Sequence, residues 1–326
     1  MWGQVLTFDT IYIAKSLPLN GSLCQMSRPD PRSFLSGFIA IIGPPNVGKS
    51  TLLNRLLGQK IAITSPKPQT TRNRILGIYN EDDCQMVFID TPGIHQTRSL
   101  LHKSMVGSAK SSLGEVDIIL LVVGFEEPAN NSELTIILRL LRQTDKTALL
   151  AINKIDLLKK ENLLPVIEIY SKMARFDSII PVSALYGDGL ETLIGELKNK
   201  LSPGPQFFPP DMVTDKSEEF LIAEIIREKI YYHTREELPY SCAVRIEQIN
   251  EDLEKNLLVV MATIFVEKAS QKGIVIGKNG KMIKKIGRNA RIEMEKIFSS
   301  HVYLELFVKI EKNWSSDARS LRRLGY

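Results

Sequence analysis

The sequence predicts an α/β domain with a mostly parallel sheet and helices on both faces, followed by a small α+β domain. Over residues 37–201, short β-rich apolar runs alternate with helical patterns, which is typical of a parallel sheet wound by crossover helices. A proline-rich stretch follows, with Pro203, Pro205, Pro209 and Pro210, and it can continue neither a helix nor a central strand. Beyond it, a helical pattern precedes three further β-rich runs, so a second domain begins there.

These patterns divide the chain into a disordered arm (1–36), a first domain (37–202), a linker (203–216) and a second domain with a C-terminal tail (217–326). The expected strands of the first domain are 38–42, 85–90, 117–123, 147–153 and 179–182, and its expected helices are 49–57, 101–113, 132–143 and 190–201. The second domain is expected to hold a helix over 218–232, strands over 241–249, 257–266 and 303–310, and a helix from Lys281.

Composition excludes several classes of protein. The chain has 326 residues, of which 44% are hydrophobic and 24% charged, so it is long enough for two globular cores. The longest apolar run, around residues 118–123, is far shorter than the roughly 18 residues that cross a bilayer, so no transmembrane segment is predicted. Cys24, Cys84 and Cys242 lie far apart, which argues against a zinc site or a disulfide framework and favours a reducing, cytoplasmic location.

A phosphate-binding loop is predicted between the first expected strand and helix. The segment Gly43-Pro44-Pro45-Asn46-Val47-Gly48-Lys49-Ser50, followed by Thr51, fits G-x-x-x-x-G-K-[ST]. In that context the backbone N–H groups converge on phosphate oxygens at a helix N-terminus. Lys49 adds a charge on the β- and γ-phosphates, and Ser50 is a magnesium ligand. The alternative is a glycine turn that only caps a helix.

A second motif, Asp90-Thr91-Pro92-Gly93, ends the next expected strand of the sheet. Asp90 there reaches magnesium through water, and the N–H of Gly93 contacts a γ-phosphate. This loop would then be ordered by GTP and released after hydrolysis. Taken alone, the four residues are equally compatible with a plain turn.

A third motif indicates guanine rather than adenine. Asn153-Lys154-Ile155-Asp156 follows another expected strand, on the edge where ligands bind in open α/β sheets. The Asp156 carboxylate accepts hydrogen bonds from N1–H and the amino group of guanine, which adenine lacks at that edge. Ser183 and Ala184 then close the pocket with a backbone N–H for the guanine oxygen. The alternative for Asp156 is a helix N-cap.

These motifs in this order resemble the translation-factor class of GTPases. P-N-V-G-K-S-T-L-L-N (45–54) and Gln69-Thr70-Thr71-Arg72 resemble the Era family and related ribosome-assembly and tRNA-modification GTPases. The resemblance implies GTP/GDP and Mg²⁺ as cofactors, with Thr71 as a magnesium ligand in the GTP state and Thr70 as its rival. It also implies that Asn46 helps to hold a K⁺ ion.

The resemblance further implies slow intrinsic hydrolysis. Ile94 stands where a water-positioning glutamine would follow the second motif, and no side chain is an evident catalytic base. His95 is a weak alternative, because a histidine in such a loop more often faces solvent. A partner or a cation is therefore expected to raise the rate.

The second domain contains a nucleic-acid motif. Gly277-Lys278-Asn279-Gly280 fits the G-x-x-G loop of a KH domain, which clamps about four nucleotides. Residues 272–291 carry seven basic residues and no acidic one, which concentrates the overall charge of +5 into one patch. The predicted RNA-binding residues are Gly277, Lys278, Asn279, Gly280, Lys281, Lys284, Lys285 and Arg288. The alternative is a solvated basic helix after a glycine turn.

The order of elements resembles a type II KH domain, and the tail 314–326, with Arg319, Arg322 and Arg323, resembles the Era C-terminus. The resemblance covers residues 37–326. It implies a monomer that binds the 3′ end of 16S rRNA, acts in maturation of the small ribosomal subunit and associates peripherally with the inner membrane. Two rival functions are a GTPase whose second domain docks a protein or a membrane, and a P-loop kinase acting on a small metabolite.

Overall fold

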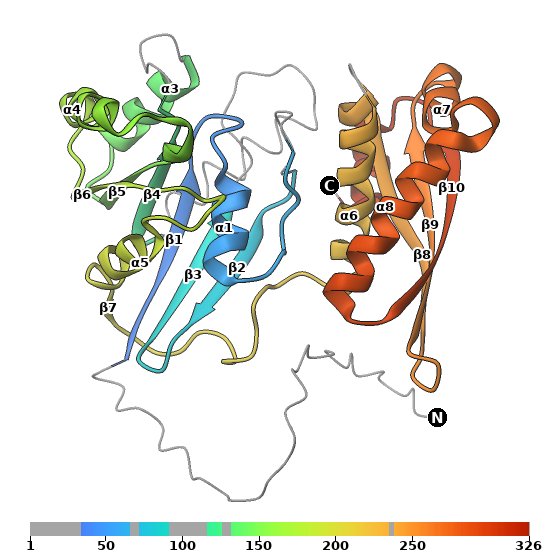
Figure 1. The fold of residues 1–326 in the computed structure, drawn as a ribbon, viewed down its shortest axis with the longest axis horizontal. Coiled ribbons are helices and arrows are strands. Elements are labelled where there is room, and N and C mark those ends of the chain that lie inside the picture. Colours follow the sequence, from blue (N-terminus) through green and yellow to red (C-terminus); the bar gives the residue numbers. More distant parts are fainter. Residues whose placement is uncertain (1–33, 66–71, 91–115, 126–131, 235–237, 326) are drawn as a thin grey trace, which may run out of the picture.

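The computed structural model describes residues 34–65, 72–90, 116–125, 132–234 and 238–325, which form two sheets with their covering helices (Figure 1). The strands of the first sheet are β1 (Leu35–Ile42), β2 (Ile75–Asn80), β3 (Cys84–Asp90), β4 (Ile118–Val123), β5 (Thr147–Ile152), β6 (Ser178–Pro181) and β7 (Ser202–Pro203). Their order is β2-β3-β1-β4-β5-β6, and β7 pairs with β1. All pairs are parallel except β2 with β3 and β7 with β1.

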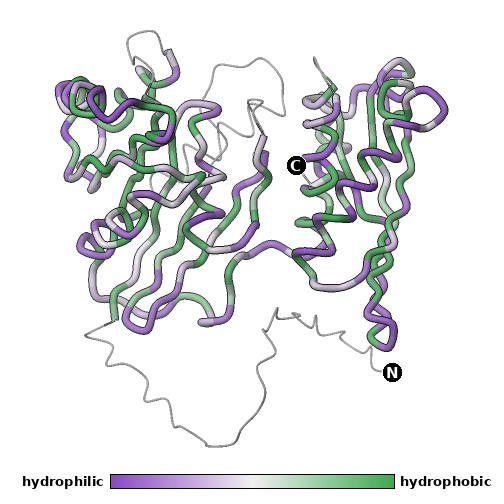
Figure 2. Tube along the Cα trace, viewed as in Figure 1, coloured by the Kyte–Doolittle hydropathy of each residue, from purple (hydrophilic) through white to green (hydrophobic). Residues whose placement is uncertain are grey.

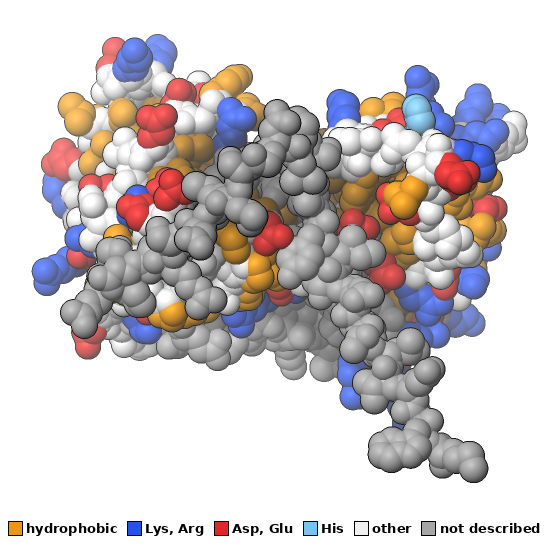
Figure 3. Space-filling view, turned by 90° about the horizontal axis from the view of Figure 1, so that it is seen from below, with side chains coloured by type: hydrophobic (Ala, Val, Ile, Leu, Met, Phe, Trp, Pro, Cys, Tyr) orange, Lys and Arg blue, Asp and Glu red, His pale blue; other side chains and the backbone are white. Residues whose placement is uncertain are grey.

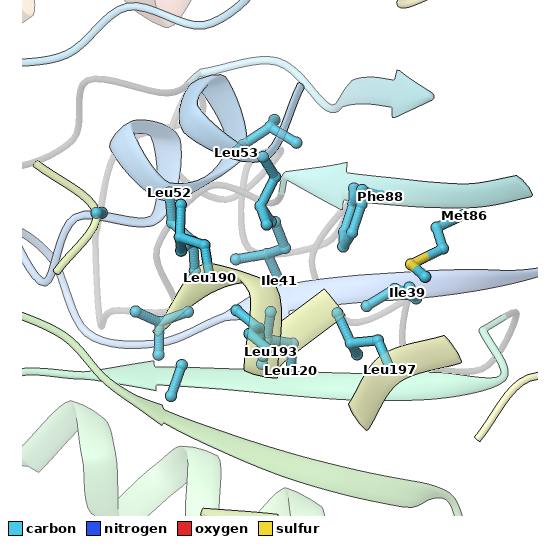
Figure 4. Packing of buried hydrophobic residues seen from close by; sticks show 14 of the residues in the cluster. Ile39, Ile41, Leu52, Leu53, Met86, Phe88, Leu120, Leu190, Leu193 and Leu197 are labelled. Carbon is cyan, nitrogen blue, oxygen red and sulfur yellow. The ribbon is translucent and has the colours of Figure 1, made fainter. Parts of the chain in front are cut away.

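Helices cover both faces of this sheet, as predicted. Every residue of β3 and β4 is buried, and successive residues of β4 pack alternately into the hydrophobic cores on the two faces of the sheet. One core joins the sheet to α1 (Lys49–Leu57) and α5 (Leu190–Lys198), and Figure 4 shows leucines of both helices meeting β1, β3 and β4. The other core joins it to α3 (Ser132–Leu141) and α4 (Leu163–Met173). The strands are accordingly apolar along most of their length (Figure 2).

Three elements of this domain were missing from the sequence-based expectation: α4, β2 and the two-residue strand β7, whose Pro203 belongs to the expected linker. The helix α4 contains Pro165, which resembles a helix breaker in the sequence. It is the third residue of the helix, where the backbone N–H has no intrahelical partner and proline is tolerated. The strand β2 is short and interrupted by Gly77, so its apolar alternation is weak. The helix expected over 101–113 lies outside the described residues.

The second domain is a three-stranded sheet whose longer helices pack on one face, while its short C-terminal helix packs against the other face. Its elements are α6 (Glu218–His233), β8 (Cys242–Asp252), β9 (Leu257–Val266), α7 (Ala269–Ile276), α8 (Lys281–Phe298), β10 (His301–Ile310) and α9 (Ala318–Arg323). The sheet order is β10-β9-β8, with β10 parallel and β8 antiparallel to β9. The helix α7 occupies a stretch in which no helix was expected, because Gly273 and the β-branched residues 274–276 favour helix poorly.

The helix α6 lies on the side of the second domain that faces the first (Figure 1). Its apolar residues Ile222, Ile225, Ile226 and Ile230 pack into the core of the second domain. Polar residues of α6, including Glu224, Arg227 and Glu228, are also buried.

Among the described residues, no helix is long and apolar enough to cross a membrane.

Candidate functional site

The predicted phosphate loop lies where β1 ends and α1 begins. β1 is the central strand from which the sheet extends in both directions, and ligands bind at such a point in open α/β sheets. Gly48 is the N-cap of α1 and has φ 96° and ψ 26°, a left-handed conformation that favours glycine. A Cβ at this position would lie 2.4 Å from Asn153 Nδ2, so the loop can pack against the third motif only with glycine here.

Lys49 has a buried ammonium group at this loop. Its side chain is 8% exposed, and Nζ donates hydrogen bonds to the carbonyl oxygens of Gly43 (2.9 Å) and Pro44 (2.8 Å). Burial lowers the pKa of Lys49 to about 8, and the nearby Asp90 carboxylate only partly opposes this shift. A phosphate anion at this point would therefore stabilise the charged amine.

Ser50 and Asp90 bring two oxygen ligands together. Ser50 Oγ donates a hydrogen bond of 2.9 Å to Asp90 Oδ2, and Asp90 is the last residue of β3. A hydroxyl and a carboxylate suit Mg²⁺, which prefers oxygen ligands and takes its remaining ones from water and phosphates. The donor set therefore fits a magnesium ion bound with a nucleotide. Thr70 and Thr71, the rival third ligands, lie outside the described residues, as do residues 91–94 and His95.

Asn153 joins the phosphate loop to the loop after β6. Its Nδ2 donates to the carbonyl oxygen of Val47 at 2.8 Å, and its Oδ1 accepts from the N–H of Ala184 at 2.9 Å. The side chain is buried, with 2% of its surface exposed. Asn153 thus fixes the relative positions of three segments that are distant in sequence.

The carboxylate of Asp156 is held at the same edge of the sheet. Ser183 Oγ donates to Asp156 Oδ1 at 2.6 Å, and Asp156 is exposed, so it is accessible to a ligand. Lys154 precedes it with φ 67° and is the N-cap of the short helical turn Ile155–Leu157. Asp156 therefore lies inside the turn, and the N-cap alternative for this residue is wrong.

The predicted RNA-binding turn precedes α8. Gly277 has φ 71° and ψ 170°, and a Cβ there would lie 2.6 Å from Met282 Cβ and 2.9 Å from the Met282 nitrogen. Only glycine allows the chain to turn this closely against the start of α8. Lys278 and Asn279 are both exposed at the tip of the turn.

A groove of about 500 Å³ runs between α8 and β10. Its lining residues are Ile283, Lys284, Gly287, Arg288 and Arg291 from α8, and Val302, Tyr303, Leu304, Glu305 and Leu306 from β10. The groove combines an apolar floor with cationic groups, which suits unstacked bases with their phosphates. Lys and Arg side chains also gather along the end of this domain that is remote from the first domain (Figure 3).

The structure divides the predicted basic residues of α8 between two faces. Lys284 and Arg288 line the groove. Lys285 is absent from that lining and instead affects His233, whose pKa is lowered by burial and by the charges of Lys285 and Lys229. The sequence reasoning missed Ile283, Gly287 and Arg291. Helical spacing from Lys284 to Gly287, Arg288 and Arg291 is the signal that could have found the last two.

Comparisons with known proteins match both domains. A family model described as a 50S ribosome-binding GTPase matches residues 38–154, and a KH domain model matches residues 237–315. A GTPase Era of Syntrophus aciditrophicus is 52% identical over 293 residues, which cover 90% of this chain and 95% of the relative. A GTPase Era of Geotalea uraniireducens is 53% identical over 296 residues, covering 90% of this chain and 99% of the relative.

Two solved structures share the whole architecture. One is Era in complex with MgGDPNP and nucleotides 1506–1542 of 16S ribosomal RNA; the other is a single-residue variant of Aquifex aeolicus Era bound to GDP·AlF4⁻. Each has a TM-score of 0.85 and 42% sequence identity, and each match covers 90% of this chain and 99% of the other. The likeness extends over both domains.

Proposed function

The chain belongs to the Era family and is a GTPase with a C-terminal KH domain; from this premise we propose that it binds the 3′ end of 16S rRNA in a nucleotide-dependent manner during assembly of the small ribosomal subunit. The observation that carries the proposal is the groove between α8 and β10, beside the Gly277–Gly280 turn. A solved relative that is 42% identical contains an RNA of this kind, which supports the choice of ligand.

Each motif has a proposed role in holding the nucleotide. The phosphate loop from Gly43 to Thr51 binds the phosphates, with Lys49 as the cation, and Asp156 and the N–H of Ala184 recognise guanine. Ser50, Asp90 and Thr71 hold Mg²⁺, which when bound neutralises charge on the β- and γ-phosphates. Asn46 Oδ1 is the proposed K⁺ ligand, and Asn46 is exposed at the tip of this loop.

The proposed catalytic strategy is positioning and electrostatic stabilisation, without a side-chain base. Phosphoryl transfer depends mainly on these two effects. The buried Lys49 ammonium supplies fixed charge, and the Asn153 bridge holds the phosphate and guanine loops in register. We therefore propose slow intrinsic hydrolysis that a partner or K⁺ accelerates.

We also propose that the protein is a monomer that contacts the membrane peripherally. Residues 203–216 are the proposed linker between its two domains.

RNA contact is proposed to have two parts. The Gly277–Gly280 turn and the Lys281, Lys284 and Arg288 side chains bind the sugar-phosphate backbone, which gives affinity that falls with salt. The groove floor accepts bases, and base contacts give sequence choice. Tyr303 is 55% exposed and lines this groove, so its ring is available for stacking.

The test is binding of a labelled oligonucleotide from the 3′ end of small-subunit rRNA, beside a scrambled oligonucleotide, with a GTP analogue or GDP present. We expect tight, sequence-selective binding that weakens as salt rises. A double variant, Lys278→Asp with Asn279→Asp, should abolish it and spare GTP hydrolysis. Lys296→Asp is the control for charge reversal near the site, because Lys296 is exposed on α8, which follows the turn, and lies outside the groove lining.

The outcomes separate this function from its rival. Equal, weak binding of both oligonucleotides by the wild type would favour a second domain that docks a protein or a membrane. Retained selective binding by the double variant would place the RNA site elsewhere on the chain. Loss of binding in the Lys296 control as well would indicate that only total charge matters.

A further inference from the structure

Arg72 of the GTPase domain inserts into the KH domain. Its Nη1 donates to the carbonyl oxygen of Cys242 at 2.8 Å, and its Nη2 donates to the carbonyl oxygen of Pro239 at 3.1 Å. The guanidinium carbon lies 5.9 Å from the centroid of the Trp314 ring. The residue is only 6% exposed. We call the group formed by Pro239, Cys242 and Trp314 the Arg72 socket.

The Arg72 socket is a rigid part of the KH domain. Trp314 is fully buried, and its Nε1 donates to the carbonyl oxygen of Ser241 at 3.1 Å. It packs in a small core with Ala243, Phe265, Leu321 and Leu324. The Cys242 carbonyl is at the start of β8, and the Pro239 carbonyl lies in the short helical turn Leu238–Ser241 directly before it. A displacement of Arg72 would therefore act directly on this sheet.

The surroundings also suit a buried guanidinium. An arginine remains charged at all accessible pH values, and its planar fork matches two carbonyl acceptors better than an ammonium does. Glu224 and Arg227 form a buried ion pair with two hydrogen bonds, of 2.7 and 2.6 Å. Burial raises the pKa of the Cys242 thiol, and the charges of Arg72 and Arg227 partly oppose this shift. The two hydrogen bonds from Arg72 to main-chain carbonyl oxygens join the GTPase domain to the KH domain in one specific geometry.

Arg72 directly follows Thr70 and Thr71 in the chain, the two candidates for the magnesium ligand that depends on GTP. Consecutive Cα atoms are about 3.8 Å apart, so residue 71 cannot move far unless Arg72 moves or changes its backbone conformation. We propose that Arg72 is the positioning residue that couples the nucleotide state to the KH domain. This proposal rests on the proposed function, because the quantity coupled is RNA affinity.

The socket connects to the RNA groove through a short structural path. Cys242 begins β8, β8 pairs with β9 along its length, and β9 pairs with β10, which forms one wall of the groove. A shift of β8 relative to the GTPase domain therefore changes where the groove lies relative to the nucleotide. RNA that contacts both domains would bind the two states with different affinity.

A second interdomain contact provides the control. Lys60 forms ion pairs with Glu228 of α6 and Glu293 of α8. Burial opposes the charge on Lys60, but the two carboxylates outweigh it and raise its pKa. Lys60 precedes Thr71 by eleven positions in the chain, so removing its charge weakens domain packing without releasing the residue next to the switch. Lys60→Met thus tests whether weaker packing between the domains is by itself enough to reduce the coupling between nucleotide state and RNA affinity.

The experiment compares full-length wild type, Arg72→Ala, Arg72→Lys and Lys60→Met. RNA dissociation constants are measured with GDP and with a GTP analogue, and their ratio is the coupling factor. For wild type we expect a factor in the usual allosteric range of about 5 to 150. Arg72→Ala should bring it within about twofold of one, because the energetic link is removed. Arg72→Lys should also lose most of it, because one ammonium cannot replace the fork.

Lys60→Met should keep the coupling factor within about twofold of wild type, a change that corresponds to under half a kcal/mol. Thermal unfolding and GDP binding show whether each variant is folded. Undiminished coupling in folded Arg72→Ala would overturn the inference, and so would equal loss of coupling in Arg72→Ala and Lys60→Met.

Hydrogen exchange without RNA tests the inference separately from the proposed function. Amide protection over residues 238–245 should change in wild type when GDP is replaced by the GTP analogue, and should not change in Arg72→Ala. If RNA fails to bind but this difference is present, the RNA function is wrong and the coupling through Arg72 stands. If RNA binds but the exchange of 238–245 is insensitive to nucleotide in wild type, the inference is wrong.

Discussion

Ser183 Oγ donates a hydrogen bond to Asp156 Oδ1 across 2.6 Å and so joins the loops that follow β5 and β6. The hydroxyl belongs to a fully buried residue, whereas the carboxylate is exposed. The buried Ser183 therefore orients the exposed carboxylate of Asp156. A carboxylate held in this way can accept the two donors of guanine without first losing rotamer entropy, which favours selective binding.

Asp156→Asn should exchange guanine preference for xanthine preference. Xanthine carries a carbonyl where guanine has its amino group, so an amide donor at position 156 becomes complementary to xanthine and opposes guanine. Competition of GDP and XDP against a fluorescent nucleotide measures the change. Asp188→Asn is the control, because Asp188 is an exposed carboxylate in the neighbouring loop. An unchanged preference in the 156 variant would remove Asp156 from base recognition.

Asn153→Ala should destabilise the GTPase domain and weaken nucleotide binding together. The substitution leaves the buried Val47 carbonyl and Ala184 N–H without the partner they have now, at about 1–3 kcal/mol for each group. Denaturant unfolding should show a loss of about 2–4 kcal/mol in the free energy of unfolding. Asn162→Ala, an exposed asparagine before α4 whose side chain makes no capping bond, should change it by less than about 0.5 kcal/mol. Equal effects of the two variants would contradict the bridging role.

The sequence predicted much of the fold because its signals are local. A buried parallel strand followed by a helix gives an apolar run and then a periodic pattern, and the phosphate loop is defined by glycines at fixed spacing. The prediction of helices on both faces of a mostly parallel sheet is confirmed. The assignment to the Era family is likewise confirmed. The proposed roles of individual site residues stay predictions.

The sequence could not reveal features that depend on tertiary contacts. In the sequence, Pro165 suggests that a helix is interrupted. In the structure it lies in the first turn of α4, where proline is tolerated. Arg72 was noticed only as part of a motif, although its guanidinium is bound by two carbonyls about 170 residues away in the chain. Lys284 and Lys285 are adjacent in the sequence, yet Lys284 lines the groove, whereas the charge of Lys285 acts on His233. Helical spacing groups Lys284 with Arg288, but only the packing of α8 beside β10 shows that this face of the helix lines the groove.

Binding of GDP should be accompanied by proton uptake near pH 8. The pKa of Lys49 is about 8 because of burial, and the phosphates of a bound nucleotide raise it again. The free protein is then about half protonated at pH 8 and the complex almost fully, so about half a proton is taken up, and less at lower pH. Calorimetry in two buffers of different ionisation enthalpy measures this number. Affinity should accordingly fall as pH rises above 8.

Lys49→Arg is the matched variant for this measurement, because a guanidinium remains protonated throughout the range. Its proton uptake at pH 8 should vanish, whatever its affinity. Uptake of the same size in the variant would assign the titration to another group. Near-normal GDP affinity in Lys49→Ala would instead contradict the assignment of the phosphate loop itself.

Gly287→Leu should separate the groove from the glycine turn in RNA binding. Gly287 lies in α8 on the groove lining, and a Cβ there would meet Leu306 Cδ1 at 3.4 Å, an ordinary contact. Leucine also favours helix over glycine by up to about 1 kcal/mol, so the fold should not be weakened. The larger side chain would fill the space that bases need. We expect at least about a tenfold loss of affinity for the rRNA oligonucleotide, or about 1.4 kcal/mol, with Tm retained.

Gly195→Leu in α5 is the control for the gain in helix propensity, because a Cβ there has no neighbour within 4 Å and the helix is far from the groove. It should leave RNA affinity unchanged. The residual binding of Gly287→Leu should depend on salt as in wild type, since the cationic contacts at the turn persist. Wild-type affinity in this variant would mean that bases do not enter the space between α8 and β10, and that the RNA contacts the turn alone.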